Sequence, residues 1–441
     1  MADVAVTTAE RPTLVLRFAD LGIALYGALR VVGEPARTVT WVVEEPLLLA
    51  ALRELETALP EPGPDETARD AIARAVRDGA FAHPDSELVL AYRLGVLLMA
   101  PAAWQLLMDC ASDPRAVLFV APCARLARVP WGLLALPAIR PAPEELARAR
   151  MAAFTESGPV PAQIPWPGED IAQCTQGYRL MELVDVLSAV PASVVHAPRA
   201  GRPAGDGGPP LLVLDPRVPG QLPDSPLGSV LGRPSADTAV ARHFAGVMAR
   251  GPVLPDVDSV TALFRRPDAG RMWLADMLVR APGRMVFVGH CSAADPGGSA
   301  DRAALHLADE APVTAADLMA AALVFPPRVA LLACASGGDY RFDEATGLVA
   351  ALILGGARVV TATLWALPTT AGYRAYAAVP GTVDPMAELI AAVDDAHGES
   401  DAGCAVNRWQ RAQMRRWRDG DVTASPLYWA ALASFAVDGA R

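Results

Sequence analysis

Short apolar runs alternate with longer amphipathic segments through the second half of the chain. The runs at 284–291, 328–334 and 357–363 are mostly apolar and have the length of strands. The segments between them, at 314–322 and 343–354, have the length and polarity of surface helices. Continuous apolar runs are typical of strands buried on both faces. The pattern therefore predicts an α/β fold with a mostly parallel sheet and helices on both of its faces.

The first hundred residues have a different pattern. Three strand-like segments separated by turn residues predict a small antiparallel meander, at 14–18, 23–32 and 38–43. Four helix-like segments follow it, at 46–59, 65–77, 87–99 and 102–110. Residues 1–112 are either a recognition or regulatory module or a structural extension of the fold that follows. We favour the extension, because the last helix leads without a linker into a strand predicted at 116–121.

The middle of the chain holds two stretches rich in turn-forming residues. Residues 137–167 contain many prolines and a helix-like segment at 144–151, and we expect them to cross the surface. Residues 198–210 are rich in glycine, proline and arginine and cannot bury much apolar area, so we expect a flexible loop. The remaining predicted elements are a helix at 174–187, strands at 193–197 and from residue 211, and helices at 237–250 and 269–279.

Two reactive side chains stand at the ends of neighbouring predicted strands. His290 closes the first run and Cys334 closes the second, and functional groups collect beyond the carboxyl ends of parallel strands. A thiol, with an ordinary pKa of about 8.5, needs a neighbouring imidazole to become an effective nucleophile at neutral pH. We expect Gly337 and Gly338 to turn the backbone tightly after Cys334. The alternative is a structural pair, because cysteines are often buried and strand-end histidines are often only hydrogen-bonded.

Several motifs in a fixed order bear on this choice. LLACASG at 331–337, GGARVVTATLW at 355–365 and SPLYWAAL at 425–432 resemble the CHAT domain, a bacterial, caspase-like, separase-related family of clan CD cysteine proteases. Fainter matches at 129–134 and 305–309 extend the resemblance from about residue 117 to about residue 437. The resemblance implies a CHAT protease domain over residues 113–441, including the loop at 198–210.

The resemblance also implies roles for individual residues. Cys334 would be the nucleophile, His290 its base, and the backbone amide of Cys291 would help to bind the oxyanion. The family usually has glycine after its histidine, so the side chain of Cys291 is a departure that could crowd the substrate. In separase-like relatives, acids after the Leu-Trp pair receive a basic substrate residue. Here Trp365, Ala366 and Thr369 would form an uncharged pocket, which predicts cleavage after a neutral, small or apolar residue.

An acidic turn follows the predicted nucleophile. Asp339, Asp343 and Glu344 could orient His290 or reach into the substrate pocket. We favour a solvated turn and helix N-terminus, where acids are favourable. The clan to which the resemblance points works with a dyad, so we assign no third catalytic residue.

Composition narrows the location and the cofactors. The formal net charge of −11 argues against a broad phosphate-binding surface, and no apolar run is long enough to cross a membrane. The first residues lack the pattern of a signal peptide, and the six cysteines lack the spacing of metal ligands. We therefore expect a cytoplasmic protein without a metal or an organic cofactor. The arginines and tryptophans at 407–418 fit a docked helix better than a nucleic-acid or membrane contact.

Three functional hypotheses follow. The leading one is a cysteine endopeptidase that cleaves an intracellular protein substrate and is activated by a partner or signal, as the resemblance to a family of bacterial conflict and cell-death systems implies. The second is a protease-shaped interaction module with weak catalysis, which the departure at Cys291 favours. The third is an RNA-binding regulator, and it rests only on the C-terminal arginines. The sequence names neither a substrate nor an activating signal nor an oligomeric state.

Overall fold

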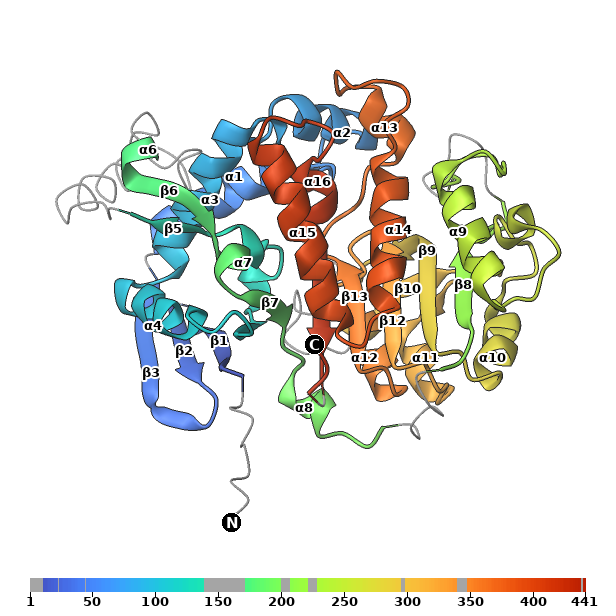
Figure 1. Cartoon of the computed structure of the whole chain (residues 1–441), viewed down its shortest axis with the longest axis horizontal. Coiled ribbons are helices and arrows are strands. Elements are labelled where there is room, and N and C mark those ends of the chain that lie inside the picture. Colours follow the sequence, from blue (N-terminus) through green and yellow to red (C-terminus); the bar gives the residue numbers. More distant parts are fainter. Residues whose placement is uncertain are drawn as a thin grey trace, which may run out of the picture.

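The apolar runs of the sequence are strands of one twelve-stranded sheet (Figure 1). The computed structural model describes residues 11–22, 24–43, 45–138, 171–199, 207–220, 228–294, 298–338, 347–437 and 439–441. The sheet runs in the order β11-β10-β9-β12-β13-β14-β7-β4-β1-β2-β3, with β8 paired to β9. Strands β8, β9, β12 and β13 pair in parallel and are connected by helices. The predicted α/β fold is therefore confirmed.

The second half of the chain supplies the strands that position the candidate site. β8, β9, β12 and β13 are parallel neighbours, and β14 closes this group in the antiparallel direction. Their bounds are β8 Pro210–Leu214, β9 Arg284–Ser292, β12 Arg328–Ala333, β13 Val359–Thr363 and β14 Leu432–Ala436. Two short strands, β10 (Ala304–His306) and β11 (Val313–Thr314), continue from the end of β9 and were not predicted.

The first half continues the same sheet. β7 (Asp185–Ser188) joins β14 to β4 (Val117–Ala121), and β4 pairs in parallel with β1 (Thr13–Asp20). β1, β2 (Leu25–Val31) and β3 (Glu34–Val43) form an antiparallel meander, as predicted. The N-terminal strands are therefore hydrogen-bonded into the sheet that carries the site.

Alternate residues of the central strands enter two cores on opposite faces of the sheet. Val286, Val288 and Leu332 lie in one core, and their neighbours Phe287 and Leu331 lie in the other. The first core is covered by α9 (Ala239–Arg250) and α14 (Pro385–His397), and the second by α10 (Arg271–Val279), α11 (Ala315–Ala320) and α12 (Leu348–Leu354). This period of two explains why these strands are apolar at nearly every position.

The remaining helices lie in the N-terminal region and around the C-terminus. The four predicted N-terminal helices are confirmed as α1 Glu45–Ala58, α2 Ala68–Arg77, α3 Pro84–Leu98 and α4 Pro101–Ala111. The others are α6 Ile171–Cys174, α7 Leu180–Leu183, α8 Ala192–Val195, α13 Thr370–Arg374, α15 Ala402–Arg418 and α16 Pro426–Trp429. Within the described ranges no single helix could span a membrane; only the bent pair of α3 and α4 passes by length and composition.

Two predicted elements between the halves are wrong. Residues 174–187 form β6 (Thr175–Arg179), the short helix α7 and β7 instead of one helix, because β6 pairs with β5 (Ala135–Pro137) and β7 fills the gap between β4 and β14. Residues 193–197 are not a strand but overlap α8. In the first of these places strand pairing decides the local structure. The predictions for 144–151 and for the acids at 339–344, and most of the loop at 198–210, lie outside the described residues.

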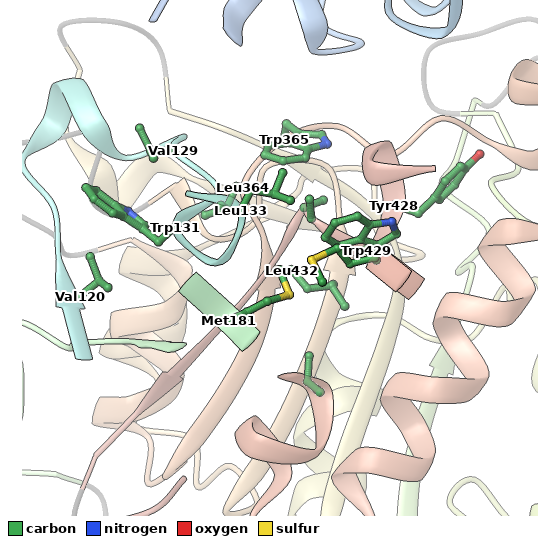
Figure 2. Packing of buried hydrophobic residues seen from close by; sticks show 14 of the residues in the cluster. Val120, Val129, Trp131, Leu133, Met181, Leu364, Trp365, Tyr428, Trp429 and Leu432 are labelled. Atoms are coloured by element: carbon green, nitrogen blue, oxygen red, sulfur yellow. The ribbon is translucent and has the colours of Figure 1, made fainter. Parts of the chain in front are cut away.

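A shared apolar core joins the two halves. Figure 2 shows Val120, Trp131 and Met181 of the first half on one side and Trp365 and Trp429 of the second half on the other. Trp131 is buried, and its ring stacks on that of Phe18 with the centroids 5.1 Å apart. It therefore anchors a turn within the core.

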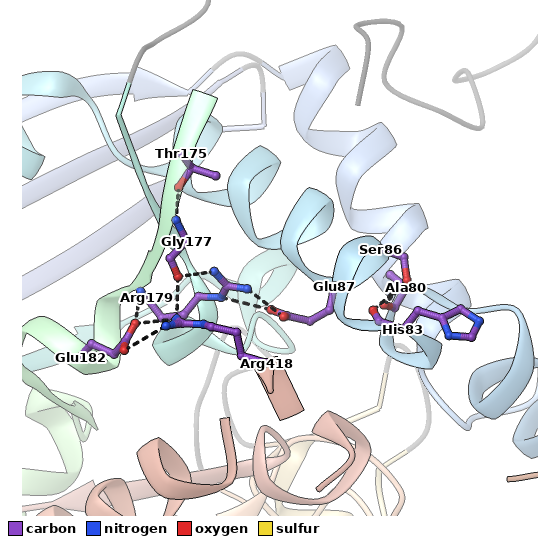
Figure 3. A network of polar contacts seen from close by, with 9 residues as sticks. All are labelled: Ala80, His83, Ser86, Glu87, Thr175, Gly177, Arg179, Glu182 and Arg418. Atoms are coloured by element: carbon purple, nitrogen blue, oxygen red, sulfur yellow. Dashed lines mark hydrogen bonds and ion pairs between the residues drawn. The ribbon is translucent and has the colours of Figure 1, made fainter. Parts of the chain in front are cut away.

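A buried ion pair also fixes the N-terminal helices. Arg179 donates from Nε and Nη2 to the carboxylate of Glu87 on α3, at 3.2 and 2.8 Å, and both side chains are almost fully buried (Figure 3). Arg418 at the end of α15 donates to the carbonyl of Gly177 and to the carboxylate of Glu182. A pair with this geometry and extra hydrogen bonds holds elements in register, although it contributes less to stability than apolar packing of the same volume. The arginines of α15 serve the fold in this way, and the predicted docked helix is confirmed.

Candidate active site

The parallel pairing of β9 and β12 brings the two reactive residues to one edge of the sheet. Gly289 lies opposite Ala333 in the register, so His290 and Cys334 each follow a paired residue at adjacent strand ends. The prediction that these two strands are neighbours is confirmed. Gly289 permits this arrangement, because a Cβ there would lie 3.3 Å from Pro216, just beyond the end of β8, and 3.1 Å from Phe287.

The imidazole of His290 is tied to a loop that follows β8. Its Nε2 lies 2.5 Å from the carbonyl oxygen of Gly228, and the residue is only 8% exposed. Because a carbonyl can only accept, Nε2 carries a proton, and in the neutral form of the ring Nδ1 is the acceptor. In this tautomer Nδ1 is the nitrogen that can accept a proton, which is what a general base needs.

The thiol of Cys334 is held by a different loop. The amide of Leu367 donates to its sulfur, and burial followed by the nearby carboxylate of Glu61 keeps the pKa of the thiol above its ordinary value. Burial therefore favours the neutral thiol in this arrangement, whereas the bond from the Leu367 amide favours the thiolate. The hydrogen bonds of His290 and Cys334 thus lead to two separate segments and do not join the two groups.

The backbone turns sharply directly after the cysteine. Ala335 has a φ of 50°, in the left-handed region that alanine rarely adopts, whereas neither Gly337 nor Gly338 has a positive φ. The expected turn is present and includes Gly337, with the amide of Gly338 bonded to the carbonyl of Ala335 at 3.1 Å, but Ala335 is its left-handed residue. Gly337 serves close packing: its amide donates to the carbonyl of Thr363 at 2.9 Å, and a Cβ would lie 3.3 Å from that oxygen. Strain of about 1–2 kcal/mol at Ala335 is the cost of presenting the thiol on this turn.

A second histidine lies beside the first. Cys291 pairs with Leu305 of β10, and His306 lies opposite His290 in the same ladder. Burial, and then the neighbouring His290, lower the pKa of His306, and its Nε2 lies 2.5 Å from the hydroxyl oxygen of Ser292. The oxyanion role of the Cys291 amide requires that its N–H point toward Cys334, and this role stays a prediction.

The three residues expected to form the substrate pocket lie on the loop that follows β13. Trp365 is fully buried, donates from Nε1 to the carbonyl of Leu427 and packs on Phe81, so its ring supports the loop from behind. Ala366 is half-buried, and Thr369 caps α13 by accepting from the amide of Gly372 at 3.1 Å. Together with the bond from Leu367 to the thiol, this places the loop directly over Cys334.

An acid from the N-terminal region reaches this loop. The amide of Ala366 donates to Oε1 of Glu61 at 3.2 Å, and Arg128 pairs with Oε2 of the same carboxylate at 2.8 Å. Nothing in the sequence around Glu61, a proline-rich turn between α1 and α2, indicated this contact. An acid is therefore present beside the pocket, but it comes from a segment remote in sequence and is already paired with an arginine.

Helix α2 contacts Tyr376, which follows α13 and the loop after β13. Arg69 donates from Nε to the hydroxyl of Tyr376 at 2.7 Å, and the guanidinium of Arg77 lies 4.9 Å from the centre of the same ring. α2 and α13 also lie side by side in Figure 1. The N-terminal region thus covers the loop that covers the thiol.

A buried acid directly after β8 organises the loop that binds His290. Asp215 is fully buried with a φ of 52°, and its Oδ2 accepts from the hydroxyl of Ser229 at 2.5 Å. Arg265 lies 3.5 Å from its Oδ1. The carboxylate of Asp215 also accepts from the amides of Val230 and Leu231 at 3.4 Å, so it fixes the residues that follow Gly228, whose carbonyl binds His290. An acid placed directly after a buried strand was the signal that could have found it.

A second polar cluster lies at the opposite end of β9. The ligand atoms of His243, Asp394 and Asp395 all lie within 4.8 Å of one another. Asp394 is fully buried and accepts from Nε2 of His243 at 2.9 Å and from Nε of Arg284 at 3.0 Å. An arginine bonded to the central carboxylate disfavours a cation, so this cluster fits a structural ion-pair network better than a metal site.

The sheet order, the strand-end cysteine and the strand-end histidine define an α/β domain with a thiol and an imidazole at one edge of its sheet. Residues 181–440, more than half of the chain, match the family model of the CHAT domain, and the chain belongs to this family. Among solved structures, it is similar to the separase–securin complex of Saccharomyces cerevisiae, with 11% sequence identity and a TM-score of 0.45 over 97% of this chain. The chain spans about 30% of the length of that matched chain. No curated protein matches the sequence.

Proposed function

We propose that the protein is a cysteine endopeptidase with Cys334 as nucleophile and His290 as general base. One observation carries this proposal: a CHAT-family chain holds a cysteine and a histidine at the adjacent carboxyl ends of two parallel, paired strands. Thiol and imidazole are the pair that thiol nucleophiles require, and a strand-end turn presents the sulfur outside the sheet.

The reaction follows from these groups. Nδ1 of His290 takes the thiol proton, the sulfur attacks the scissile carbonyl, and the amides of Cys291 and Cys334 stabilise the oxyanion. The imidazolium then protonates the leaving amine, and water hydrolyses the thioester to release the acid and the thiol. Trp365, Ala366 and Thr369 shape the pocket for a neutral residue, because Glu61 beside them is already paired with Arg128.

The protease is latent in the arrangement described above. A thiol whose pKa is raised by burial, an imidazole held by Gly228 and a loop covered by Glu61 and α2 all oppose the reaction. We propose that a protein partner or signal moves the loop after β13 and thereby allows Cys334 to meet His290. The setting would be a bacterial conflict or cell-death system, in the cytoplasm, without a metal, an organic cofactor or a nucleic-acid ligand.

A second function is favoured by the raised pKa of Cys334. If no signal releases the thiol, the same fold would act as a protease-shaped interaction module. One experiment distinguishes the endopeptidase from the interaction module. Proteins encoded near this chain are co-expressed with the intact form and, separately, with Cys334→Ala. New N-termini that appear only with the intact form support the endopeptidase; identical products from both forms would exclude it and leave the interaction module.

A further inference from the structure

A cavity of about 300 Å³ lies beside the candidate active site and shares its loops. One wall begins at Ser229, directly after the Gly228 carbonyl that binds His290. Another wall is formed by Thr369 and Thr370, on the loop whose Leu367 amide binds the thiol. The cavity is therefore walled by the two segments that bind His290 and Cys334.

The lining of the cavity is basic. Arg233, Arg265 and Arg374 line it together with one acid, Asp384. Arg265 is balanced by the buried Asp215. Among the described residues neither Arg233 nor Arg374 forms an ion pair; Arg374 donates from Nε to the carbonyl of Val383 at 2.6 Å. Arg233 and Arg374 thus give the lining two cations against the one carboxylate of Asp384.

The single acid in the lining is occupied by the fold. Oδ1 of Asp384 accepts from the hydroxyl of Thr370 at 2.6 Å and from the amide of Ala387 at 3.0 Å, because Asp384 caps α14. The cavity is also lined by Thr238, the N-cap of the twelve-residue helix α9. The partial positive charge at the starts of these two helices adds to that of the arginines.

We propose that this cavity is a substrate subsite that binds a carboxylate side chain near the scissile bond. Asp or Glu of the substrate would pair with Arg374 and Arg233, while the pocket of Trp365, Ala366 and Thr369 takes the neutral residue at the bond itself. Charge-assisted hydrogen bonds from a planar guanidinium suit a carboxylate. The assignment rests on the proposed endopeptidase function but uses residues outside the dyad.

The test measures binding, so that it does not require cleavage. Fluorescein-labelled heptapeptides of alanine and serine with a single Glu, and the matched peptides with Gln, are titrated into the full chain carrying Cys334→Ala. We expect the Glu peptides to bind about tenfold more tightly, as one charge-assisted pair would give. Arg374→Gln or Arg233→Gln should bring the ratio close to one, whereas Arg280→Gln, an exposed arginine outside the cavity, should leave it unchanged.

Each other outcome decides the question. Equal binding of the Glu and Gln peptides, no binding of either, or a Glu preference that survives both arginine variants would overturn the subsite. Binding of inorganic phosphate without a preference for the Glu peptides would also overturn it and indicate a free anion as the ligand. A Glu preference in a chain whose intact form never cleaves would leave the subsite standing and remove the proposed protease function.

Discussion

The two ends of the parallel strands carry the same kinds of groups and hold them differently. At the amino ends, Arg284 begins β9, and its guanidinium and the ring of His243 both bind the carboxylate of Asp394 directly. At the carboxyl ends, His290 and Cys334 are each bound to a separate loop. Both clusters contain a histidine and are largely buried, yet only the second can change partners by moving a loop.

This difference separates stability from reactivity within one sheet. Buried charged groups that pair with each other inside the core have no partner of lower energy elsewhere, so their pairing stabilises the fold. Groups whose hydrogen-bond partners lie on loops lose those partners when the loops move. A reactive pair held in this way can stay inactive until such a movement occurs. Substitutions at the two ends should therefore have different effects. Those at the amino ends should reduce the stability of the fold, and those at the carboxyl ends should abolish catalysis.

The largest effect is expected from the dyad. Cys334→Ala and His290→Ala should each reduce cleavage of an identified substrate by about 10⁴-fold or more, and the double variant should be little worse, because coupled groups act as a unit. The melting temperature should stay close to that of the intact chain. Cys123→Ala, a half-buried cysteine outside the site, serves as the control. Cleavage near the intact level in either variant would assign the chemistry to other residues.

The next effect concerns the cluster at the amino ends. Asp394→Ala leaves Arg284 without its buried partner, which should lower the free energy of unfolding by about 3–5 kcal/mol. The neighbouring Asp395→Ala, at an exposed position, should change it by less than about 0.5 kcal/mol. Urea denaturation compares the two. Equal stability of both variants would show that this cluster does not fix the fold as argued.

The sequence predicted the elements that bury apolar faces and missed those that depend on partners. The strands through His290 and Cys334 and the four N-terminal helices follow from periodicity, because each carries its own apolar pattern. β7, by contrast, is a strand only because β4 and β14 lie on either side of it. β10 exists because the end of β9 extends past the sheet.

The candidate site shows the same division. His290 and Cys334 could be predicted, because each stands at the end of its own apolar run. Glu61 and Asp215 could not be assigned roles, since one contacts the loop after β13 from about three hundred positions away and the other acts through the residues that follow Gly228. The left-handed turn at Ala335 was also hidden, because the two glycines nearby were the better candidates by local preference.

A pH-dependent effect of intermediate size comes from His397. It is fully buried, its Nε2 bonds to the hydroxyl of Thr361 at 2.8 Å, and burial lowers its pKa to about 3; Asp394 opposes this shift, and Arg328 and Arg284 add to it. Below about pH 6.5 the unfolded chain binds a proton that the folded chain does not. Stability should therefore fall as the pH drops from 6.5 toward 3, by up to about 1.4 kcal/mol per unit.

The variant His397→Gln tests this assignment. It should flatten the dependence of unfolding free energy on pH between 6.5 and 4, while His83→Gln, at an exposed position, should not. The measurement is urea denaturation at half-unit intervals of pH. An unchanged slope in His397→Gln would mean that other groups, Asp394 among them, account for the loss of stability in acid.

The smallest effect concerns the cover over Cys334, and it tests the comparison most directly. Glu61→Gln removes a negative charge that raises the pKa of the thiol and weakens both the contact with Ala366 and the pair with Arg128. Iodoacetamide should then label Cys334 several-fold faster, up to about tenfold, because more thiolate is present and the loop opens more often. Peptide mass spectrometry separates Cys334 from the other five cysteines.

Glu66→Gln is the matched control, since Glu66 also pairs with an arginine, Arg74, in the same region but does not contact the loop after β13 among the described residues. Equal labelling rates in the intact chain and in Glu61→Gln would show that the N-terminal region does not restrain the thiol, and the contrast between the two ends of the sheet would then lie in the dyad alone.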